Sequence, residues 1–380
     1  MKFLFLLVFS ISMQAAVTQA AVTQAAVTQA AIPADSSLGL SKKRFLRDRT
    51  IIPLPVVFRF PETRFGAGAV VSATFSFAKD SAWAKPSQFS FGITYTQNKQ
   101  VLIFMPFSIF AANNKYYLNS DTGLFKYNYL YFGIGENRVA EERFDVTFPR
   151  VRLLAAKLVA KNTYAGLRFQ YEAYNVTGTA LDGELGTGRV AGSTFSRTVS
   201  LGVSVLKDSR DAVFFPRHGV FGEFYVLPTL RAFGADRNFV RLFADLAHYQ
   251  SFGSKHFVLA TNYTTSFIVG SNIPFSQLSF LGGPRKMRGI YEGFFRDKNT
   301  ALFQAEARLD VWKSLGVVGF GAMGFMGDDK TLIRLNLPKF TYGAGLRVTV
   351  QKKNHLNLRL DYGLSPYGKG NFYATLGEAF

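Results

Sequence analysis

The residues most able to do chemistry gather in one long connection of the chain. This connection runs from about 271 to 300 and contains Arg288, Gly289 and Tyr291 among further glycines, basic residues and aromatics. Compact proteins rarely keep so long a loop unless it has a function or is disordered. Its content of Gly, Arg and aromatic residues argues against disorder. We therefore expect this loop to do more than link two elements.

A second charged group consists of Asp208, Arg210 and Asp211, followed by Pro216 and Gly219. Two acids beside a base could form a catalytic cluster. However, Asp, Ser, Pro and Gly at such close spacing are typical of a hydrogen-bonded turn. A structural turn network is the favoured interpretation.

No other pattern points to an enzyme, a metal or a cofactor. The four histidines are scattered without metal-ligand spacing. The chain has no cysteine, which removes thiolate sites and disulfides. A hydrolase would need an oriented Ser–His pair, and the order of residues selects none. Residues 319–324 spell G-x-G-x-x-G, but a charged turn and a strand follow instead of the helix that a dinucleotide site needs. We predict no enzyme, no cofactor and no metal.

Strands are the elements that must position these residues. From residue 51 onward, segments of about ten residues alternate between apolar and polar side chains and are separated by Gly, Asn, Asp and Lys turns. They number about sixteen, an even number, as bacterial single-chain barrels require. The predicted strands are 51–60, 64–78, 88–97, 100–110, 114–127, 145–159, 162–178, 193–207, 218–229, 237–252, 255–270, 301–312, 315–326, 340–351, 355–364 and 370–380.

The strand after the long loop shows the clearest alternation. Within 301–311, Ala, Phe, Leu and Val face one way, while Glu306, Arg308 and Asp310 face the other. An apolar outer face with a charged inner face is typical of a membrane-spanning barrel. A soluble sandwich could alternate in the same way, but so many long strands favour the barrel. The predicted fold class is all-β, a transmembrane antiparallel β-barrel of about sixteen strands.

Composition and the N-terminal region indicate export. Residues 1–31 have the features of a signal peptide and low-complexity leader, with a basic start, an apolar run over 3–13 and a threefold Ala-Val-Thr-Gln-Ala repeat. Residues 32–50 would form a short periplasmic segment, and 51–380 the barrel. Outside the N-terminus no apolar stretch is long enough for a membrane-spanning helix. Export without such a helix leaves the periplasm, the exterior or the outer membrane.

The basic excess suggests an anionic partner. The formal charge is +19, but Lys and Arg are dispersed without a dense tract, which argues against nucleic acid. Outer-membrane lipid and the phosphates of lipopolysaccharide are the more plausible partners. The chain ends on Phe380, closing an alternating segment. This ending is similar to the C-terminal signal of outer-membrane barrels, and alternatively marks an aromatic girdle. Both interpretations favour the outer membrane of a Gram-negative bacterium.

Five motifs in order resemble those of the outer-membrane assembly-factor superfamily that includes BamA and TamA (the bacterial surface antigen family). The resemblance covers about 51–380. It includes a departure, because residues 320–324 lack the acid that the family's Phe-x-Asp-x-Gly strand carries. The five motifs are the turn 208–211, the downstream Pro216 with Gly219, the loop segment 288–291, Glu306 with Arg308, and residues 359–363.

The resemblance implies that the long loop folds back into the barrel lumen. A guanidinium there needs an acid, because an unpaired charge in a partly desolvated lumen is costly. We predict that Arg288 pairs with Glu306, and that Asp361 substitutes for the acid missing at Ala322. Glycines of 319–324 are expected to relieve crowding against the loop. The alternative is that Arg288 is an exposed loop cation and Glu306 an ordinary lumen residue.

The resemblance also implies assistance in inserting or translocating proteins or lipids at the outer membrane. Family members that do so carry periplasmic POTRA domains, and about twenty residues before the first strand leave no room for one. We therefore expect a barrel-only member with a periplasmic or lipoprotein partner. A weak seam between the first and last strands could open and template a client strand. The alternative is a passive pore or a structural barrel subunit. The oligomeric state stays open.

Overall fold

The computed structural model describes residues 46–60, 64–81, 84–212, 215–253, 256–312, 314–351 and 356–380. The predicted signal peptide and leader, 1–31, lies outside the described residues, as does most of the segment 32–50. Within the described part, no helix is long and apolar enough to span a membrane.

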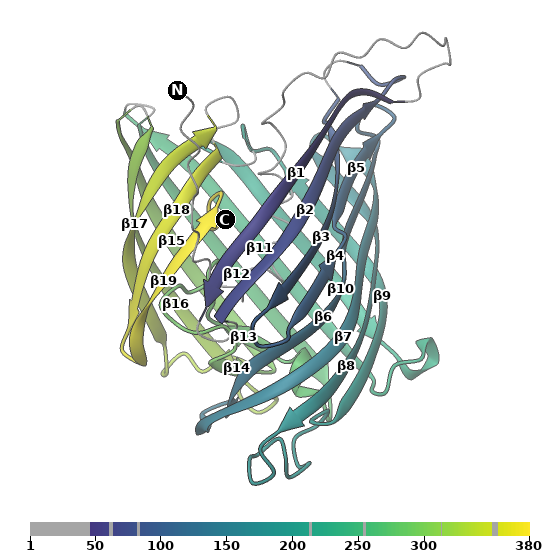
Figure 1. The fold of residues 1–380 in the computed structure, drawn as a ribbon, viewed down its shortest axis with the longest axis vertical. Helices are drawn as coiled ribbons and strands as arrows, with labels where there is room; N and C mark the ends of the chain where they lie inside the picture. The colour runs from purple at the N-terminus through teal and green to yellow at the C-terminus, as the bar shows by residue number, and fades with distance from the viewer. Residues whose placement is uncertain are drawn as a thin grey trace.

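Strands form one large antiparallel sheet rolled into a barrel (Figure 1). Each wall strand pairs with its neighbours in chain order, which is why alternating hairpins suffice to build it. The wall strands are β1 (Leu46–Phe60), β2 (Arg64–Phe77), β3 (Ser87–Thr96), β4 (Val101–Phe104), β5 (Phe107–Ala111), β6 (Tyr116–Ile134), β7 (Asn137–Ala160), β8 (Thr163–Thr179), β9 (Phe195–Asp208), β10 (Gly219–Thr229), β11 (Phe239–Phe252), β12 (Phe257–Gly270), β15 (Asn299–Trp312), β16 (Leu315–Gly327), β17 (Lys339–Gln351), β18 (Leu356–Ser365) and β19 (Gly368–Leu376).

The wall has sixteen strand positions, because β4 and β5 share one of them. Both pair with β3 on one side and with β6 on the other. Met105 and Pro106 separate them, and Pro106 interrupts the pairing because proline has no backbone N–H to donate. The predicted fold class and strand number are confirmed.

Three boundaries differ from the prediction. β1 begins at Leu46, so the last residues of the predicted segment 32–50 belong to a strand. The hairpin β6–β7 extends to Ile134 and Asn137, about seven residues beyond each predicted end. Polar and charged residues such as Glu141 and Arg143 hid this extension, because it projects past the apolar band of the wall. The last strand ends at Leu376 rather than 380.

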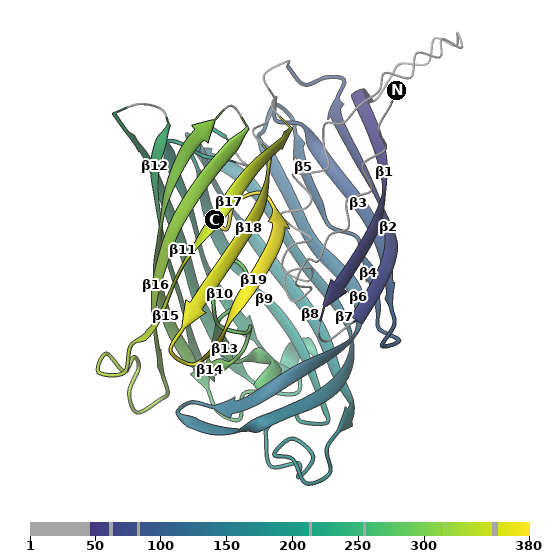
Figure 2. The ribbon, with the colours of Figure 1, turned by 60° about the vertical axis from the view of Figure 1, so that its left-hand side comes forward.

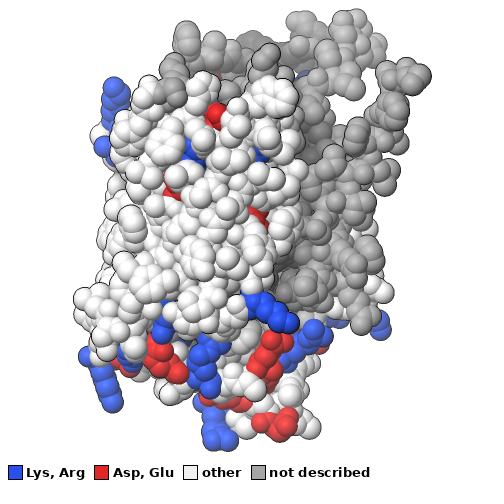
Figure 3. All heavy atoms as spheres, turned by 90° about the vertical axis from the view of Figure 1, so that its left-hand side faces the viewer, with Lys and Arg blue, Asp and Glu red and all other residues white. Residues whose placement is uncertain are grey.

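Side chains alternate across the wall as the sequence predicts. On β17, Tyr342 is 59% and Leu346 45% exposed on the outer face, whereas Arg347 is 3% exposed on the inner face. Figure 3 shows a broad band of uncharged outer surface above a rim rich in Lys, Arg, Asp and Glu. Apolar groups outside and charged groups inside are the reverse of a soluble protein and suit lipid around the wall.

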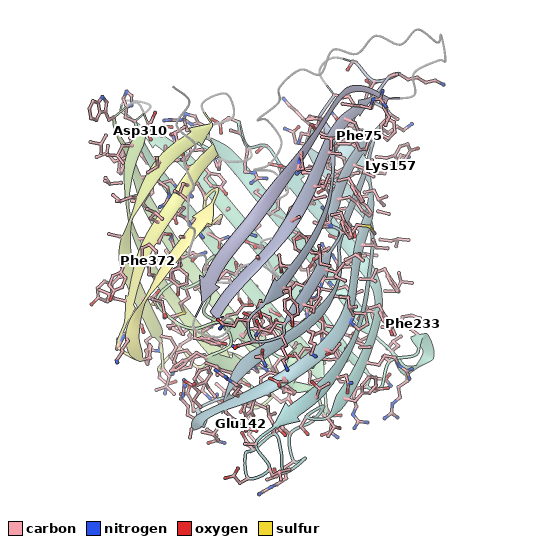
Figure 4. All side chains as sticks on the ribbon, in the orientation of Figure 1. Phe75, Glu142, Lys157, Phe233, Asp310 and Phe372 are labelled. Atoms are coloured by element: carbon pink, nitrogen blue, oxygen red, sulfur yellow. The ribbon has the colours of Figure 1, made fainter. Side chains whose placement is uncertain are left out.

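The two ends of the barrel differ in loop length. Most connections at the end where β1 starts are short turns, such as residues 112–115 and 161–162. Long connections lie at the opposite end, including 180–194 and 328–338. Figure 4 labels Lys157 and Asp310 at the short-turn end and Glu142 at the long-loop end. Outer-membrane barrels have short periplasmic turns and longer extracellular loops, so the short-turn end is periplasmic.

The first and last strands are the edges of the sheet. β1 pairs with β2, and β19 pairs with β18. Among the described residues no hydrogen-bonded register joins β1 to β19, and Figure 2 shows the two strands apart. The wall therefore has a seam whose backbone groups lack the partners that every other wall strand has.

A candidate lumen plug held by an arginine cluster

The long connection between β12 and β15 lies inside the barrel. It contains a short 3-10 turn (Phe275–Gln277) and two short paired strands, β13 (Ser279–Leu281) and β14 (Phe295–Asp297). Met287 and Ile290 at its tip are buried, as are Leu281 and Phe295. These apolar residues pack against Leu302 and Met326 of the inner wall. Residues 271–298 are called the plug below.

Arg288 at the tip of the plug is 2% exposed and lies between two acids of the wall. Its Nη2 donates to Glu306 on β15 and its Nη1 to Asp361 on β18. The guanidinium also stacks over the Phe320 ring, 3.6 Å from its centroid. The structure thus places Arg288, Glu306 and Asp361 together, with both carboxylates fully buried. Ala322, where the family motif has an acid, lies opposite Gln304 on the neighbouring strand.

Further arginines complete what we call the arginine cluster. Arg308 is 2.7 Å from Glu306, and Arg347 is 2.6 Å from both Asp361 and Glu378. Arg359 is 3.5 Å from Asp361 and donates to the backbone oxygen of Pro284. Four guanidiniums share three carboxylates, so each acid bridges at least two bases. Such a buried network holds its members in place, because removing one leaves buried hydrogen-bonding groups of the others without their partner.

The backbone around Arg288 makes the close approach possible. Gly289 has φ +108°, and a Cβ there would lie 2.7 Å from the oxygen of Leu364. Its N–H donates to the Tyr373 hydroxyl at 3.0 Å, and its carbonyl accepts from Asn371 at 3.0 Å. Gly363 on β18 leaves the room, since a Cβ there would be 2.5 Å from the Gly289 nitrogen. The plug tip is therefore bound to β18 and to the edge strand β19.

Glycines of β17 make room for the cluster from the wall side. A Cβ on Gly343 would lie 2.5 Å from the Phe320 ring, and one on Gly345 only 1.9 Å from Asp361. On β16, a Cβ on Gly324 would meet Leu281 of the plug at 2.8 Å, whereas Gly319 faces open space. Of the G-x-G-x-x-G stretch, then, only part relieves crowding against the plug, and a strand rather than a helix follows it.

The chain end turns into the lumen instead of completing the last strand. Gly377 has φ +78°, after which Glu378 pairs with Arg347 and the backbone oxygen of Phe380 accepts from Arg308 at 3.1 Å. Phe380 packs against inner-wall Tyr249. The expectation that Phe380 closes an alternating strand was wrong, because the buried arginines draw the tail inward. Its role as an insertion signal stays a prediction.

The start of the plug is attached to the opposite wall. Phe275 is fully buried among aromatics of β6, β7 and β8. Gln277 donates to Glu172 of β8 at 2.8 Å, and its carbonyl accepts from Arg241 of β11. Because its tip binds β15, β18 and β19, the plug crosses the lumen from one side to the other.

Tyr291 lies outside the arginine cluster. Its ring meets Phe132 of β6 edge-on, with centroids 5.4 Å apart. Tyr373, which sequence reasoning did not select, is the aromatic residue that binds the Arg-Gly backbone instead. The alternation of β19, which sets Tyr373 and Asn371 on the same face, was the available signal.

Asp208, Arg210 and Asp211 form a turn network at the periplasmic rim. Arg210 donates to both carboxylate oxygens of Asp208, at 2.8 and 3.0 Å. Asp211 accepts from the backbone N–H groups of Arg217 and His218. Gly219 has φ +105°, and a Cβ there would be 2.3 Å from the Ser209 oxygen. Pro216 is buried within the same turn.

Within the described residues, no group of three or more acids and histidines could hold a metal ion. Glu292 of the plug is a further acid, and its side chain is half-buried. Burial raises its pKa to about 7, although Arg150 and Arg296 lower it. The ion pairs and hydrogen bonds of this arrangement therefore attach the plug to the wall of the barrel.

The comparisons with known proteins agree with the barrel fold. A family model described as the Omp85 superfamily domain matches residues 62–380. Three solved structures are similar, each covering 88–89% of this chain. BamA from Haemophilus ducreyi lacking POTRA domains 1–3 has 11% identity and TM-score 0.56, with 69% of its length covered. CdiB from Escherichia coli has 10% identity and a TM-score of 0.55, with 62% of its length covered. CdiB from Acinetobacter baumannii has 10% identity and a TM-score of 0.54, with 59% of its length covered. The chain thus spans less than two thirds of either CdiB structure. No curated protein matches.

Proposed function

Because this chain belongs to the Omp85 superfamily and forms a barrel of the Gram-negative outer membrane, we propose that it assists insertion or translocation of proteins or lipids there. The seam between β1 and β19 is the proposed working element. An unpaired strand edge can accept a client strand by β-augmentation, which gives the client backbone partners inside the bilayer. A periplasmic or lipoprotein partner would deliver the client.

One observation supports this proposal above the others. The plug tip binds β19, an edge of the seam, through Asn371 and Tyr373. A movement of β19 would therefore pull on the plug. Conversely, a plug whose Arg288 had lost its ion pairs with the wall would no longer hold β19. In a passive pore, the plug would need no attachment to the edge strand in particular.

Cysteine tethers across the seam test the proposal, since the native chain has no cysteine to interfere. Cysteine pairs would be placed along β1 and β19, and oxidised or reduced in cells depleted of the native protein. We expect the oxidised tether to lower outer-membrane protein levels or lipid asymmetry, and reduction to restore them. A tether between Val71 and Phe91, which face each other on β2 and β3, is the matched control and should have no effect.

Depletion alone distinguishes the competing function. If the outer-membrane proteome and lipid asymmetry stay normal on depletion while the purified protein conducts ions in planar bilayers, the protein is a passive pore and the proposal fails.

A further inference from the structure

The two ends of the barrel differ in charge. In the described long-loop connections outside the plug, acids and bases are equal in number, namely Lys99, Arg189, Arg231, Arg237, Lys330 and Arg334 against Glu136, Asp182, Glu184, Asp236, Asp328 and Asp329. In the described short turns, bases dominate, namely Lys79, Lys85, Lys115, Lys161, Arg210 and Arg217 against Asp80 and Asp211. The basic excess of the loops therefore lies at the periplasmic end.

Several of these bases are already paired. Arg210 binds Asp208, Arg217 lies 2.5 Å from Asp310, and Lys85 lies 4.0 Å from Asp208. Within the described residues, other lysines at the same end form no ion pair with an acid. Four of them lie at the adjacent ends of β6 to β9 or in the turns beside these ends, and are called the lysine patch, namely Lys115, Lys157, Lys161 and Lys207.

Backbone pairing brings the lysine patch together. The Lys115 carbonyl accepts from Leu158, next to Lys157, and Lys161 lies in the turn from β7 to β8. Lys207 on β9 is opposite Thr163, two residues after Lys161. The patch spans the periplasmic ends of the four strands β6 to β9, a width of about 15 Å at the usual strand spacing. All four side chains are exposed.

The patch lies directly above lipid-facing apolar residues. Leu167 and Val205 on the outer faces of β8 and β9 are 59% and 46% exposed, and Val159 beside Lys157 is 61% exposed. Tyr116, 48% exposed, lies under the Lys115 ammonium at 5.7 Å. Figure 4 shows Lys157 on the outer side of the wall. Lysines above an apolar band, with an aromatic beside them, are at the level of lipid headgroups.

We propose that the lysine patch binds the phosphates of anionic phospholipids in the periplasmic leaflet. Two of its members, Lys157 and Lys207, project from the outer faces of strands, toward lipid rather than toward the aqueous mouth. An acidic protein surface would instead be met by lysines at the turn tips. The long-loop end, which faces lipopolysaccharide, has no comparable excess. The inference does not depend on the seam and stands if the proposed assembly function fails.

The test uses the full chain in nanodiscs of phosphatidylcholine that contain a small fraction of spin-labelled lipid. Phosphatidylglycerol is compared with phosphatidylcholine for its association with the protein. We expect a preference for phosphatidylglycerol that is lost in about 1 M salt, because surface charges are then screened within about 3 Å. The double variant Lys157→Gln with Lys207→Gln should lower the preference by up to roughly fivefold per lysine. Arg189→Gln with Lys330→Gln, at the long-loop end, is the matched control.

Three outcomes would overturn the proposal. The native protein could associate equally with both lipids, or the lysine variant could keep its preference, or the control could lose as much as the lysine variant. A protein partner would show differently, as salt-sensitive binding of soluble polyglutamate that the lysine variant loses while lipid preference is unchanged. The variants change exposed side chains only, so loss of folding is not expected, and heat-modifiability on gels checks this.

Discussion

At the scale of single residues, Arg288 forms the ion pairs that attach the tip of the plug to the wall. Replacing it by Ala leaves Glu306 and Asp361 with less positive charge in a buried site, which typically costs about 3–5 kcal/mol. We expect Arg288→Ala to lower the temperature at which the barrel loses its compact gel mobility and to expose the plug to protease. Arg189→Ala, on an exposed loop, is the control. Unchanged heat-modifiability and protease resistance in Arg288→Ala would show that the arginine cluster does not hold the plug.

Glu292 gives a pH dependence with a definite sign. Burial raises its folded-state pKa to about 7, above the value near 4.3 of an unfolded chain. The folded protein therefore binds more protons between these values, and its stability falls as pH rises through them. Because the side chain is partly exposed, we discount the shift and expect Glu292→Gln to be more stable than the native protein by about 1 kcal/mol at pH 8.

At about pH 3 the two proteins should unfold alike, since Glu292 is then protonated in both the folded and the unfolded state. Thermal unfolding in detergent across this range measures the difference between them. A difference that does not vary with pH would contradict the assignment.

At the scale of elements, β17 must carry glycine at the position where the arginine cluster packs against it. Gly345→Ala would place a Cβ 1.9 Å from Asp361 and 2.8 Å from the Leu360 carbonyl. We expect a loss of about 1–3 kcal/mol, typical of overpacking, together with protease access to the plug. Gly319→Ala on the neighbouring strand meets nothing within 4 Å and should be neutral. Equal unfolding temperatures for the two variants would argue against a tightly packed interface.

The same elements show what sequence alone could predict. Alternation identified the strands, their number and the inward direction of Glu306 and Arg308, because period two is a local property. The extension of β6 and β7 was missed because it lies beyond the apolar band that gives the signal. The inward turn of the tail was also missed. It depends on Arg308 and Arg347 of other strands, and such long-range pairing leaves no local pattern around Glu378.

At the scale of the whole molecule, the plug crosses the lumen of the barrel. It is attached to β8 and β11 at one end and to β15, β18 and β19 at the other. We expect the native protein to conduct poorly in planar bilayers, and a variant with residues 283–294 replaced by a Gly-Ser linker to conduct several-fold more. Equal conductance in both proteins would mean that the plug does not obstruct the lumen.

The position of the plug along the chain has a consequence for the order of biogenesis. Arg288 precedes Asp361 by 73 positions and Gly289 precedes Tyr373 by 84, so the plug is synthesised well before the residues of β18 and β19 that hold its tip. Contacts this distant in sequence form late, after the loop-closure entropy has been overcome. Plug locking is therefore a maturation step that can report completion of the C-terminal hairpin. A nascent barrel lacking β18 and β19 would remain unlocked and recognisable to proteases as unfinished.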